Sequence, residues 1–86
     1  MTEPVLNDQV VFTDFDGKEG ILVDLNTKKY YQINETAMLI WKALEERKTV
    51  NEIVDEVIAA YDVSREHATE SVKRLLEHLR RNNLVA

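Results

Sequence analysis

The sequence predicts an α+β domain in which a three-stranded antiparallel sheet is followed by three helices, in the order βββααα. The first third of the chain combines β-branched and aromatic residues with turn-forming residues, which is typical of short strands joined by hairpins. The remainder places apolar residues three and four positions apart behind polar capping residues, which is typical of amphipathic helices. One face of such a sheet can pack on the helices and give a domain of two layers.

Three strands are expected in the first third of the chain. Residues 9–15 are rich in β-branched and aromatic side chains, and Asp16-Gly17 follows as a tight-turn dipeptide. Residues 21–25 form the second strand, and residues 29–33 form a shorter third strand after a second polar turn. The strands therefore form an antiparallel meander in which the third strand lies at an edge.

The third strand runs into a helix without a loop, and Asn34 explains why this is possible. Asparagine is a preferred N-cap because its side chain accepts hydrogen bonds from the free backbone N–H groups of the first turn. Glu35 beside it suits the positive end of the helix dipole. The helix is expected to end near Lys48. Its apolar stripe consists of Ala37, Ile40, Trp41 and Leu44.

Two further helices are each expected to begin at a hydroxyl side chain. Thr49 and Glu52 have the spacing of a capping box, and Ser64 can cap the last helix. The inward residues of the second helix are Ile53, Val54, Val57, Ile58 and Tyr61. Those of the third, the longest stripe in the chain, are Ala68, Val72, Leu75, Leu76 and Leu79.

The two ends of the chain carry different predictions. Asn82-Asn83 is expected to end the third helix, because asparagine tolerates the left-handed conformation that follows many helices. Leu84-Val85 can then fold back on the core. Residues 1–7 contain the single proline and no periodicity, and are expected to form a loose arm. Residues 1–86 are therefore read as one domain, and helices two and three with the hairpin resemble a winged helix-turn-helix.

The composition argues against several classes of function. Cysteine is absent, which removes disulfides, thiolate nucleophiles and the common structural zinc sites. His67 and His78 lie on one predicted helix but are too far apart to share a metal. No catalytic constellation or phosphate-binding glycine loop is present, so neither catalysis nor a cofactor or metal is expected. No signal peptide or membrane span is evident, and a cytoplasmic domain is expected.

The net charge of −5 is unevenly distributed along the chain. Residues 64–86 hold five basic and three acidic side chains, whereas the preceding segments are acidic. An acidic protein is repelled by a phosphate backbone unless it has a strong basic patch, and this segment is a weak one. Nucleic acid is therefore not the expected partner.

The edge position of the third strand suggests a binding function. An edge strand presents unpaired N–H and C=O groups, and a peptide can add to it as a further strand. The residues expected to bind such a peptide are Lys29, Tyr30, Tyr31, Gln32 and Ile33. Tyr31 and Ile33 share one face of the strand and are expected to be partly buried, whereas Tyr30 and Gln32 point the other way.

The third helix is expected to form the second wall of a groove beside this strand. Its periodicity alone does not determine which flank lines the groove. Core packing explains Leu76 and the neighbouring basic residues less well than it explains the rest of the stripe, which favours their flank. The expected lining residues are Thr69, Val72, Lys73, Leu76 and Arg80, with a basic rim that suits an acidic stretch of peptide.

The chain contains an ordered set of motifs: Tyr30-Tyr31-Gln32-Ile33-Asn34, Thr36-Ala37, Ile40-Trp41, Thr49-Val50-Asn51-Glu52-Ile53, and Ser71-Val72 with Leu75, Leu76, Leu79, Asn83 and Leu84. This ordered set resembles the motifs of the PqqD family of peptide chaperones. The resemblance covers about residues 20–86. The Tyr30-Tyr31 pair is more similar to the stand-alone partners of lasso-peptide leader peptidases than to the protein of the pyrroloquinoline quinone pathway. Ser71 and Asn83 stand where the family often has Asp and Gly.

The resemblance implies a winged-helix-like element that recognises precursor peptides of ribosomally made, modified peptides. The leader region of the precursor would lie between the third strand and the third helix and extend the sheet. The domain would carry out no catalysis, and would present the peptide to a separate enzyme such as a leader peptidase or cyclase. The protein would be a monomer or a homodimer.

Two other functions remain possible from the residues alone. A winged-helix DNA-binding domain would use Arg65, Lys73, Arg74, Arg80 and Arg81 on the third helix, although the acidic residues interleaved with them argue against it. An edge-strand dimerisation module would use the third strand to pair two copies of the chain. The first predicts salt-sensitive duplex binding, and the second predicts a mass that depends on protein concentration.

Overall fold

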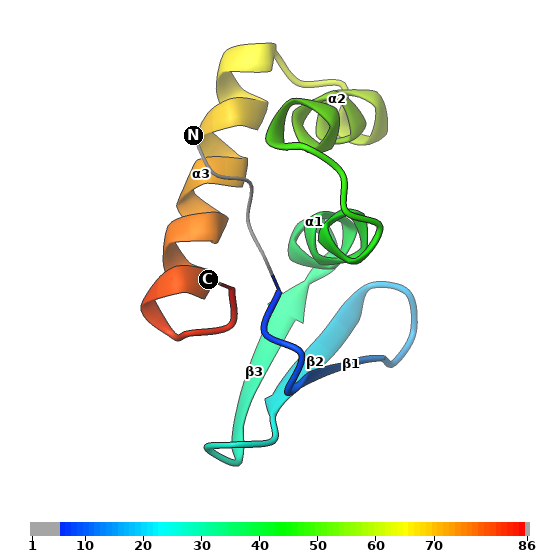
Figure 1. Cartoon of the computed structure of the whole chain (residues 1–86). Helices are drawn as coiled ribbons and strands as arrows, with labels where there is room; N and C mark the ends of the chain where they lie inside the picture. The colour runs from blue at the N-terminus through cyan, green and yellow to red at the C-terminus, as the bar shows by residue number, and fades with distance from the viewer. Residues whose placement is uncertain (1–5, 86) are drawn as a thin grey trace.

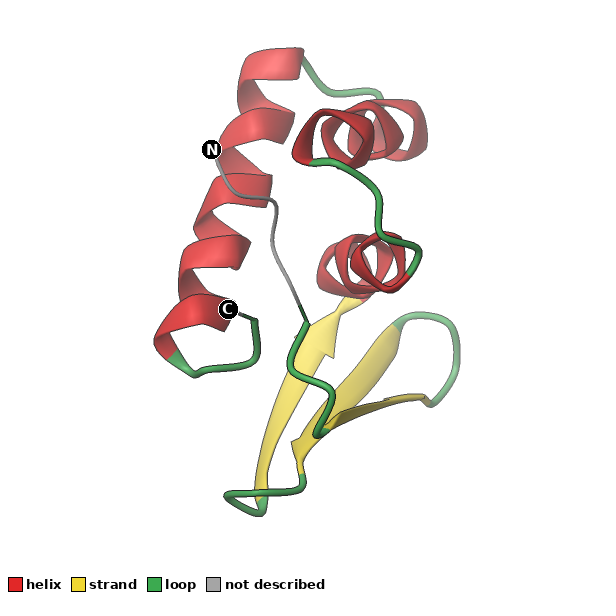
Figure 2. Cartoon of the chain, in the orientation of Figure 1, coloured by secondary structure: helices red, strands yellow, loops and turns green. Residues whose placement is uncertain are grey.

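The computed structural model describes residues 6–85 and confirms the predicted order of elements. A three-stranded antiparallel sheet precedes three helices (Figures 1 and 2). The elements are β1 (Val10–Asp14), β2 (Glu19–Asp24), β3 (Lys29–Asn34), α1 (Glu35–Glu45), α2 (Val50–Tyr61) and α3 (Arg65–Arg81). The sheet order is β1-β2-β3, so β3 lies at one edge, as predicted.

Aspartates hold the two hairpin turns, and each turn is longer than a two-residue hairpin. Asp24 is 3% exposed, and its carboxylate accepts hydrogen bonds from the backbone N–H groups of Asn26 and Thr27. A buried carboxylate is tolerated here because these donors replace water. Lys28 completes this turn with a φ of 64°. Asp24 therefore fixes the turn from which β3 begins.

The register of the sheet separates a covered face from an open face. Phe12, Leu22 and Tyr31 are direct neighbours across the three strands and face the helices. Val11, Val23 and Tyr30 form the adjacent row, which points away from the helices. Tyr30 is 73% exposed, so it adds nothing to the core, as its alternation with Tyr31 predicted.

The junction between β3 and α1 forms as the sequence predicted. Asn34 has extended backbone angles, and its side-chain Oδ1 accepts a hydrogen bond of 2.9 Å from the backbone N–H of Ala37. The buried face of α1 then packs on the sheet at Gly20. A Cβ atom at Gly20 would lie 2.7 Å from Phe12 and 2.9 Å from the Met38 sulfur, so only glycine fits this close approach without a shift.

Helix α1 ends at Glu45, three residues before the predicted end. Arg47 adopts a left-handed conformation with φ 60°, and its backbone N–H and that of Lys48 bond back to Leu44 and Ala43. The sequence offers no glycine or asparagine there, which is why the stop was missed. The Lys48 ammonium then contacts Glu56 of α2 at 3.0 Å, and this hydrogen bond is the main cause of its raised pKa.

Helices α2 and α3 have the caps that the sequence predicted. Thr49 and Glu52 form the reciprocal capping box, and the Ser64 hydroxyl accepts a hydrogen bond from the backbone N–H of His67. At the other end of α3, Asn83 has a left-handed φ of 60°. The backbone of α3 lies close to that of α2, and it does not come comparably close to α1 or β3.

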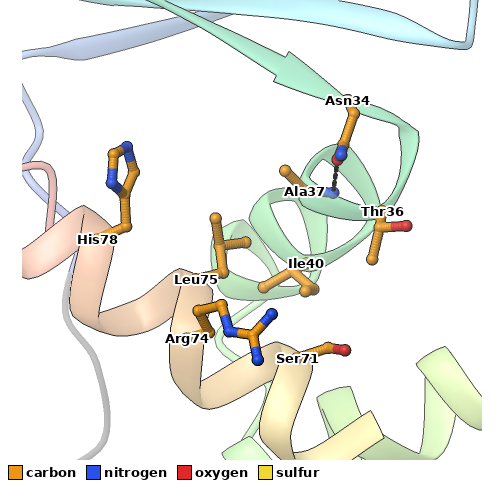
Figure 3. A pocket seen from close by; sticks show the side chains of 8 residues that line it. All are labelled: Asn34, Thr36, Ala37, Ile40, Ser71, Arg74, Leu75 and His78. Atoms are coloured by element: carbon orange, nitrogen blue, oxygen red, sulfur yellow. Dashed lines mark hydrogen bonds between the residues drawn. The ribbon is translucent and has the colours of Figure 1, made fainter. Parts of the chain in front are cut away.

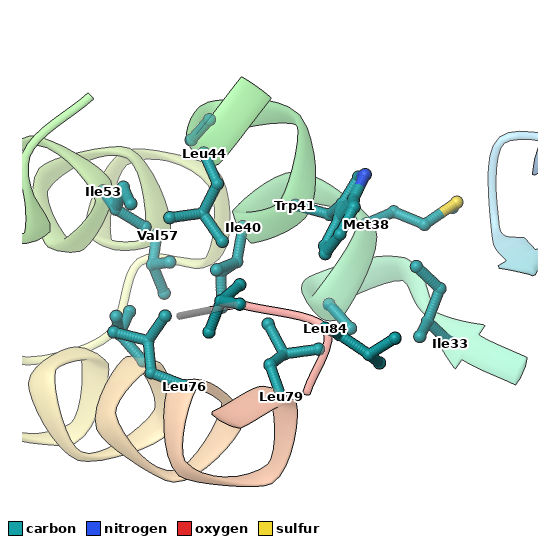
Figure 4. Packing of buried hydrophobic residues seen from close by; sticks show 14 of the residues in the cluster. Ile33, Met38, Ile40, Trp41, Leu44, Ile53, Val57, Leu76, Leu79 and Leu84 are labelled. Carbon is teal, nitrogen blue, oxygen red and sulfur yellow. The ribbon is translucent and has the colours of Figure 1, made fainter. Parts of the chain in front are cut away.

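The core lies between the sheet and the three helices (Figure 4). Ile40 and Trp41 of α1 and Val57 of α2 are buried there, and Leu76 and Leu79 point into the same cluster from α3. Leu84 and Val85 are also buried, so the predicted return of the C-terminal tail onto the core is confirmed. Among residues 6–85, no helix is long and apolar enough to cross a bilayer.

The predicted loose arm is wrong for its last two residues. Leu6 forms an isolated β-bridge with Val85, and the backbone N–H of Asn7 donates to Leu84 at 3.1 Å. The Asn7 side chain also donates to the carbonyl of Asn83. This pairing uses the main chain and one amide side chain, so it leaves no apolar periodicity in the sequence. Residues 1–5 of the arm lie outside the described part of the chain.

Candidate functional site

The outer edge of β3 is the first component of the candidate site. No other strand among residues 6–85 pairs with this edge. Backbone N–H and C=O groups alternate along such an edge and can bond another extended chain. In Figure 1, β3 is also the strand nearest to α3, so an added chain would meet a helix wall on its far side.

The second component is a pocket between the start of α1 and the middle of α3. It has a volume of about 450 Å³. Its floor is apolar, with Leu75 from α3 beside Ala37 and Ile40 from α1 (Figure 3). The remaining lining residues are polar or charged: Asn34, Thr36, Ser71, Arg74 and His78. The pocket can therefore hold an apolar side chain while polar groups surround its opening.

A smaller pocket of about 200 Å³ continues from the first one along β3. It shares Asn34, Ala37, Leu75 and His78 with the larger pocket. Its other lining residues come from the sheet, the end of α3 and the C-terminal tail: Leu22, Tyr31, Gln32, Ile33, Leu79 and Leu84. We call the two pockets together the β3–α3 groove, because the smaller one lies between β3 and α3 and the larger one continues it toward the start of α1.

The structure places most of the predicted strand residues at this groove. Tyr31, Gln32 and Ile33 line it. Tyr31 is half-buried and Ile33 is buried, as predicted from their shared face. Lys29 and Tyr30 belong to the same strand but line neither pocket.

The flank of α3 that was predicted to line the groove does not line these two pockets. Val72 and Leu76 are 0% and 4% exposed and belong to the core, so they cannot form an open groove floor. Thr69, Lys73 and Arg80 line neither of the two pockets. Each lies two positions from Ser71 or His78, and two positions turn a helix by about 200°. They therefore lie on the opposite flank of the helix from the groove.

Within α3, the pocket-lining residues that were not among the predicted binding residues are Ser71, Arg74, Leu75 and His78. Leu75 was assigned to the core stripe, but it is half-buried and lies at the edge of that stripe. The signal that could have found it is the helical angle from the centre of the stripe. Leu75 and Leu76 lie on opposite sides of the line through Val72 and Leu79, and periodicity does not say which side the neighbouring helix covers.

The groove shows no grouping of residues typical of metal-dependent chemistry. Within the described residues, no three histidine or carboxylate side chains gather where a metal ion could be held. The groove combines a free main-chain edge, an apolar floor and a few polar rim groups, which is the arrangement of a peptide-binding surface.

The model of one protein family matches residues 19–85, and its description is "PqqD: Coenzyme PQQ synthesis protein D (PqqD)". The chain belongs to the PqqD family. The match begins at β2 and includes both walls of the groove, whereas β1 precedes it. No curated protein matches the chain.

Two solved structures share the fold of this PqqD-family chain. The first is described as "TbiB1 in Complex with the TbiA(beta) Leader Peptide", with 32% sequence identity and a TM-score of 0.88 over 94% of this chain and 93% of that chain. The second is "Lasso peptide synthetase B1 complexed with the leader peptide", with a TM-score of 0.87 over 99% of both chains. At 24% identity, this second likeness concerns the fold alone.

Proposed function

We propose that this chain binds the leader region of a ribosomally synthesised precursor peptide in the β3–α3 groove. The leader adds as a strand to the outer edge of β3, and its apolar side chains enter the two pockets. The observation that carries this proposal is the free edge of β3 beside an apolar groove. Main-chain hydrogen bonds would supply affinity, and the pockets would supply specificity.

Family membership and one structural relative support this proposal. The relative at 32% identity was solved in complex with a leader peptide, and its fold covers nearly the whole of this chain. The strand that would receive the peptide and the helix that faces it both lie within the residues that match the PqqD family. The proposed pathway is therefore the synthesis of a lasso peptide or a related modified peptide.

In this proposal the domain itself makes and breaks no covalent bond. It holds the leader so that a separate enzyme, such as a leader peptidase or cyclase, acts on the precursor. The domain works in the cytoplasm, where precursor peptides are made, and needs no cofactor. Its contribution to the rate is to raise the local concentration of the precursor at the enzyme.

The direct test is fluorescence anisotropy with a labelled leader peptide, taken from a precursor whose gene lies beside the gene for this chain. Saturable binding with a Kd in the micromolar range or below is expected, and a labelled DNA duplex titrated in parallel should not bind. Leu75→Asp should weaken leader binding by at least tenfold while circular dichroism stays native, because it places a charge on the apolar floor of the groove. Lys73→Asp, on the opposite flank of α3, is the matched control and should bind normally.

If the protein without substitutions does not bind the leader, the proposal is contradicted. Leader binding that survives Leu75→Asp in a folded protein would move the site away from the groove. Duplex binding that weakens steeply with salt would favour a nucleic-acid function instead.

A further inference from the structure

The β3–α3 groove differs in charge from the rest of the molecule. The chain holds 16 acidic residues against 11 Lys and Arg, with a net charge of −5. None of the residues that line the two pockets of the groove is acidic, and the charged or titratable ones are Tyr31, Arg74 and His78. The 270 Å³ pocket on the other side of α1 includes both Glu35 and Lys42. In an acidic protein, the lining of the groove therefore carries Arg74 and His78 and no carboxylate.

Arg74 has donor capacity left for a ligand. Its side chain is 77% exposed, and its one ion pair within residues 6–85 is with Glu70 on the same helix, at 3.4 Å. A guanidinium group carries five N–H donors, and this exposed contact between residues four apart is weak. In Figure 3, Arg74 reaches over the pocket from α3, and His78 stands one turn further along the same helix.

Other donors surround the same opening. Thr36 and Ser71, which carry hydroxyl groups, also line the pocket. The start of α1 also borders the pocket, and the positive end of its dipole favours a negative charge there. Glu35 lies in this first turn of α1 but lines the pocket on the other side of the helix. Glu70 is the carboxylate that contacts a residue of the rim, through its ion pair with Arg74.

We infer that the groove selects leaders in which an acidic residue stands close to an apolar anchor residue. The anchor occupies the floor formed by Ala37, Ile40 and Leu75, and Arg74 and His78 bind the carboxylate at the rim. Arg74 and His78 are then specificity-determining residues, because a leader with an apolar anchor but no acidic residue beside it would lack the carboxylate that they bind. This inference rests on the proposed function and names the chemistry of its ligand.

The test compares two charge reversals on the same helix. Arg74→Glu and Arg80→Glu change the net charge equally, but Arg80 lies on the flank that does not line the groove. In leader titrations by anisotropy, Arg74→Glu should raise Kd by roughly tenfold and Arg80→Glu by less than about twofold. The binding of the unmodified protein should weaken with added salt, and that of Arg74→Glu should depend less on salt.

A charge exchange locates the partner residue. Leaders in which each Asp or Glu in turn is replaced by Lys are titrated against the unmodified protein and against Arg74→Glu. One replacement should weaken binding to the unmodified protein and restore binding to Arg74→Glu. If the two Arg→Glu variants behave alike, or if no replacement restores binding, the inference is overturned.

The two proposals fail in different ways. If the unmodified protein binds no leader, the proposed function fails. If the leader binds and Leu75→Asp abolishes binding, while Arg74→Glu and Arg80→Glu have equal effects, the groove is the site and the charge selection alone is wrong. Circular dichroism of each variant shows that the loss of binding does not come from unfolding.

Discussion

Helix α3 has a closed side, packed against α2, and an open side that faces β3 and the start of α1. Its backbone lies close to α2, and Val72 and Leu76 are sealed into the core with Val57 of α2. Toward β3 and the start of α1 the same helix leaves the β3–α3 groove, where Leu75 is half-buried. Two consecutive leucines therefore differ in burial, and we propose that Leu76 serves stability whereas Leu75 serves binding.

In the proposed function, this difference gives a small domain a binding site without a deep cleft. A chain of 86 residues has little core, so most apolar residues are needed for stability. Leaving one strand edge and one helix flank uncovered exposes few apolar side chains and yet offers a main-chain template. The closed side of α3 supplies the rigidity that holds the open side in place.

The largest expected effect is on the closed side. Leu76→Ala removes a side chain that is 4% exposed and leaves a cavity, so we expect it to lower the free energy of unfolding by about 2–4 kcal/mol. Urea denaturation followed by circular dichroism measures this loss. A cost below about 1 kcal/mol would mean that this side of α3 is not closed.

The next effect concerns the cap at the groove. Asn34→Ala removes the side-chain acceptor for the N–H of Ala37 and should cost about 1 kcal/mol. Because Asn34 also lines both pockets, the variant should weaken leader binding as well. Ser64→Ala, which removes the corresponding cap of α3 away from the groove, should cost a similar free energy and leave leader binding unchanged. Equal binding by the two variants would contradict the placement of the site.

Leu75→Ala should reverse the pattern of Leu76→Ala. Because Leu75 is half-buried at the groove, its truncation should cost less than about 1 kcal/mol of stability. The leader should nevertheless bind several-fold more weakly, since the floor of the larger pocket is lost. Unfolding and anisotropy titrations on the same samples compare the two leucines directly. A larger stability cost for Leu75 than for Leu76 would exchange the two sides of the helix.

The smallest effect is expected for the ion pair between α3 and α2. Arg65 contacts Asp55, and both side chains are 61% exposed. Solvent screens such a pair, so Arg65→Ser should lower stability by less than about 0.5 kcal/mol. A larger loss, abolished in 1 M salt, would show that charge rather than apolar packing closes this side.

The sequence predicted the elements because each boundary carries local chemistry. Asn34, Thr49 and Ser64 are the caps that the structure contains, and their residue types announce helix starts. The end of α1 was missed because Arg47 adopts a conformation that its residue type does not favour. The first hairpin was predicted from Asp16-Gly17, but four residues separate β1 from β2.

Of the groove, the sequence could predict the strand wall but not the residues of the helix wall. Its strand wall follows from strand order, which the meander pattern determines. Its helix wall depends on how α3 is rotated and on which neighbour it packs against, and this tertiary information is absent from a helical period. The prediction therefore named the helix that lines the pockets but placed Leu76 in the groove, whereas Leu75 is the residue that lines it.

Amide hydrogen exchange with and without a saturating leader peptide tests the central claim most directly. The sheet has two edges, β1 and β3, and the second one adjoins the groove. If the leader adds as a strand to β3, outward-facing amides among Lys29–Asn34 should become strongly protected, while the outward amides of Val10–Asp14 keep their exchange rates. Protection at β1, or unchanged exchange at β3 with the leader fully bound, would contradict the account.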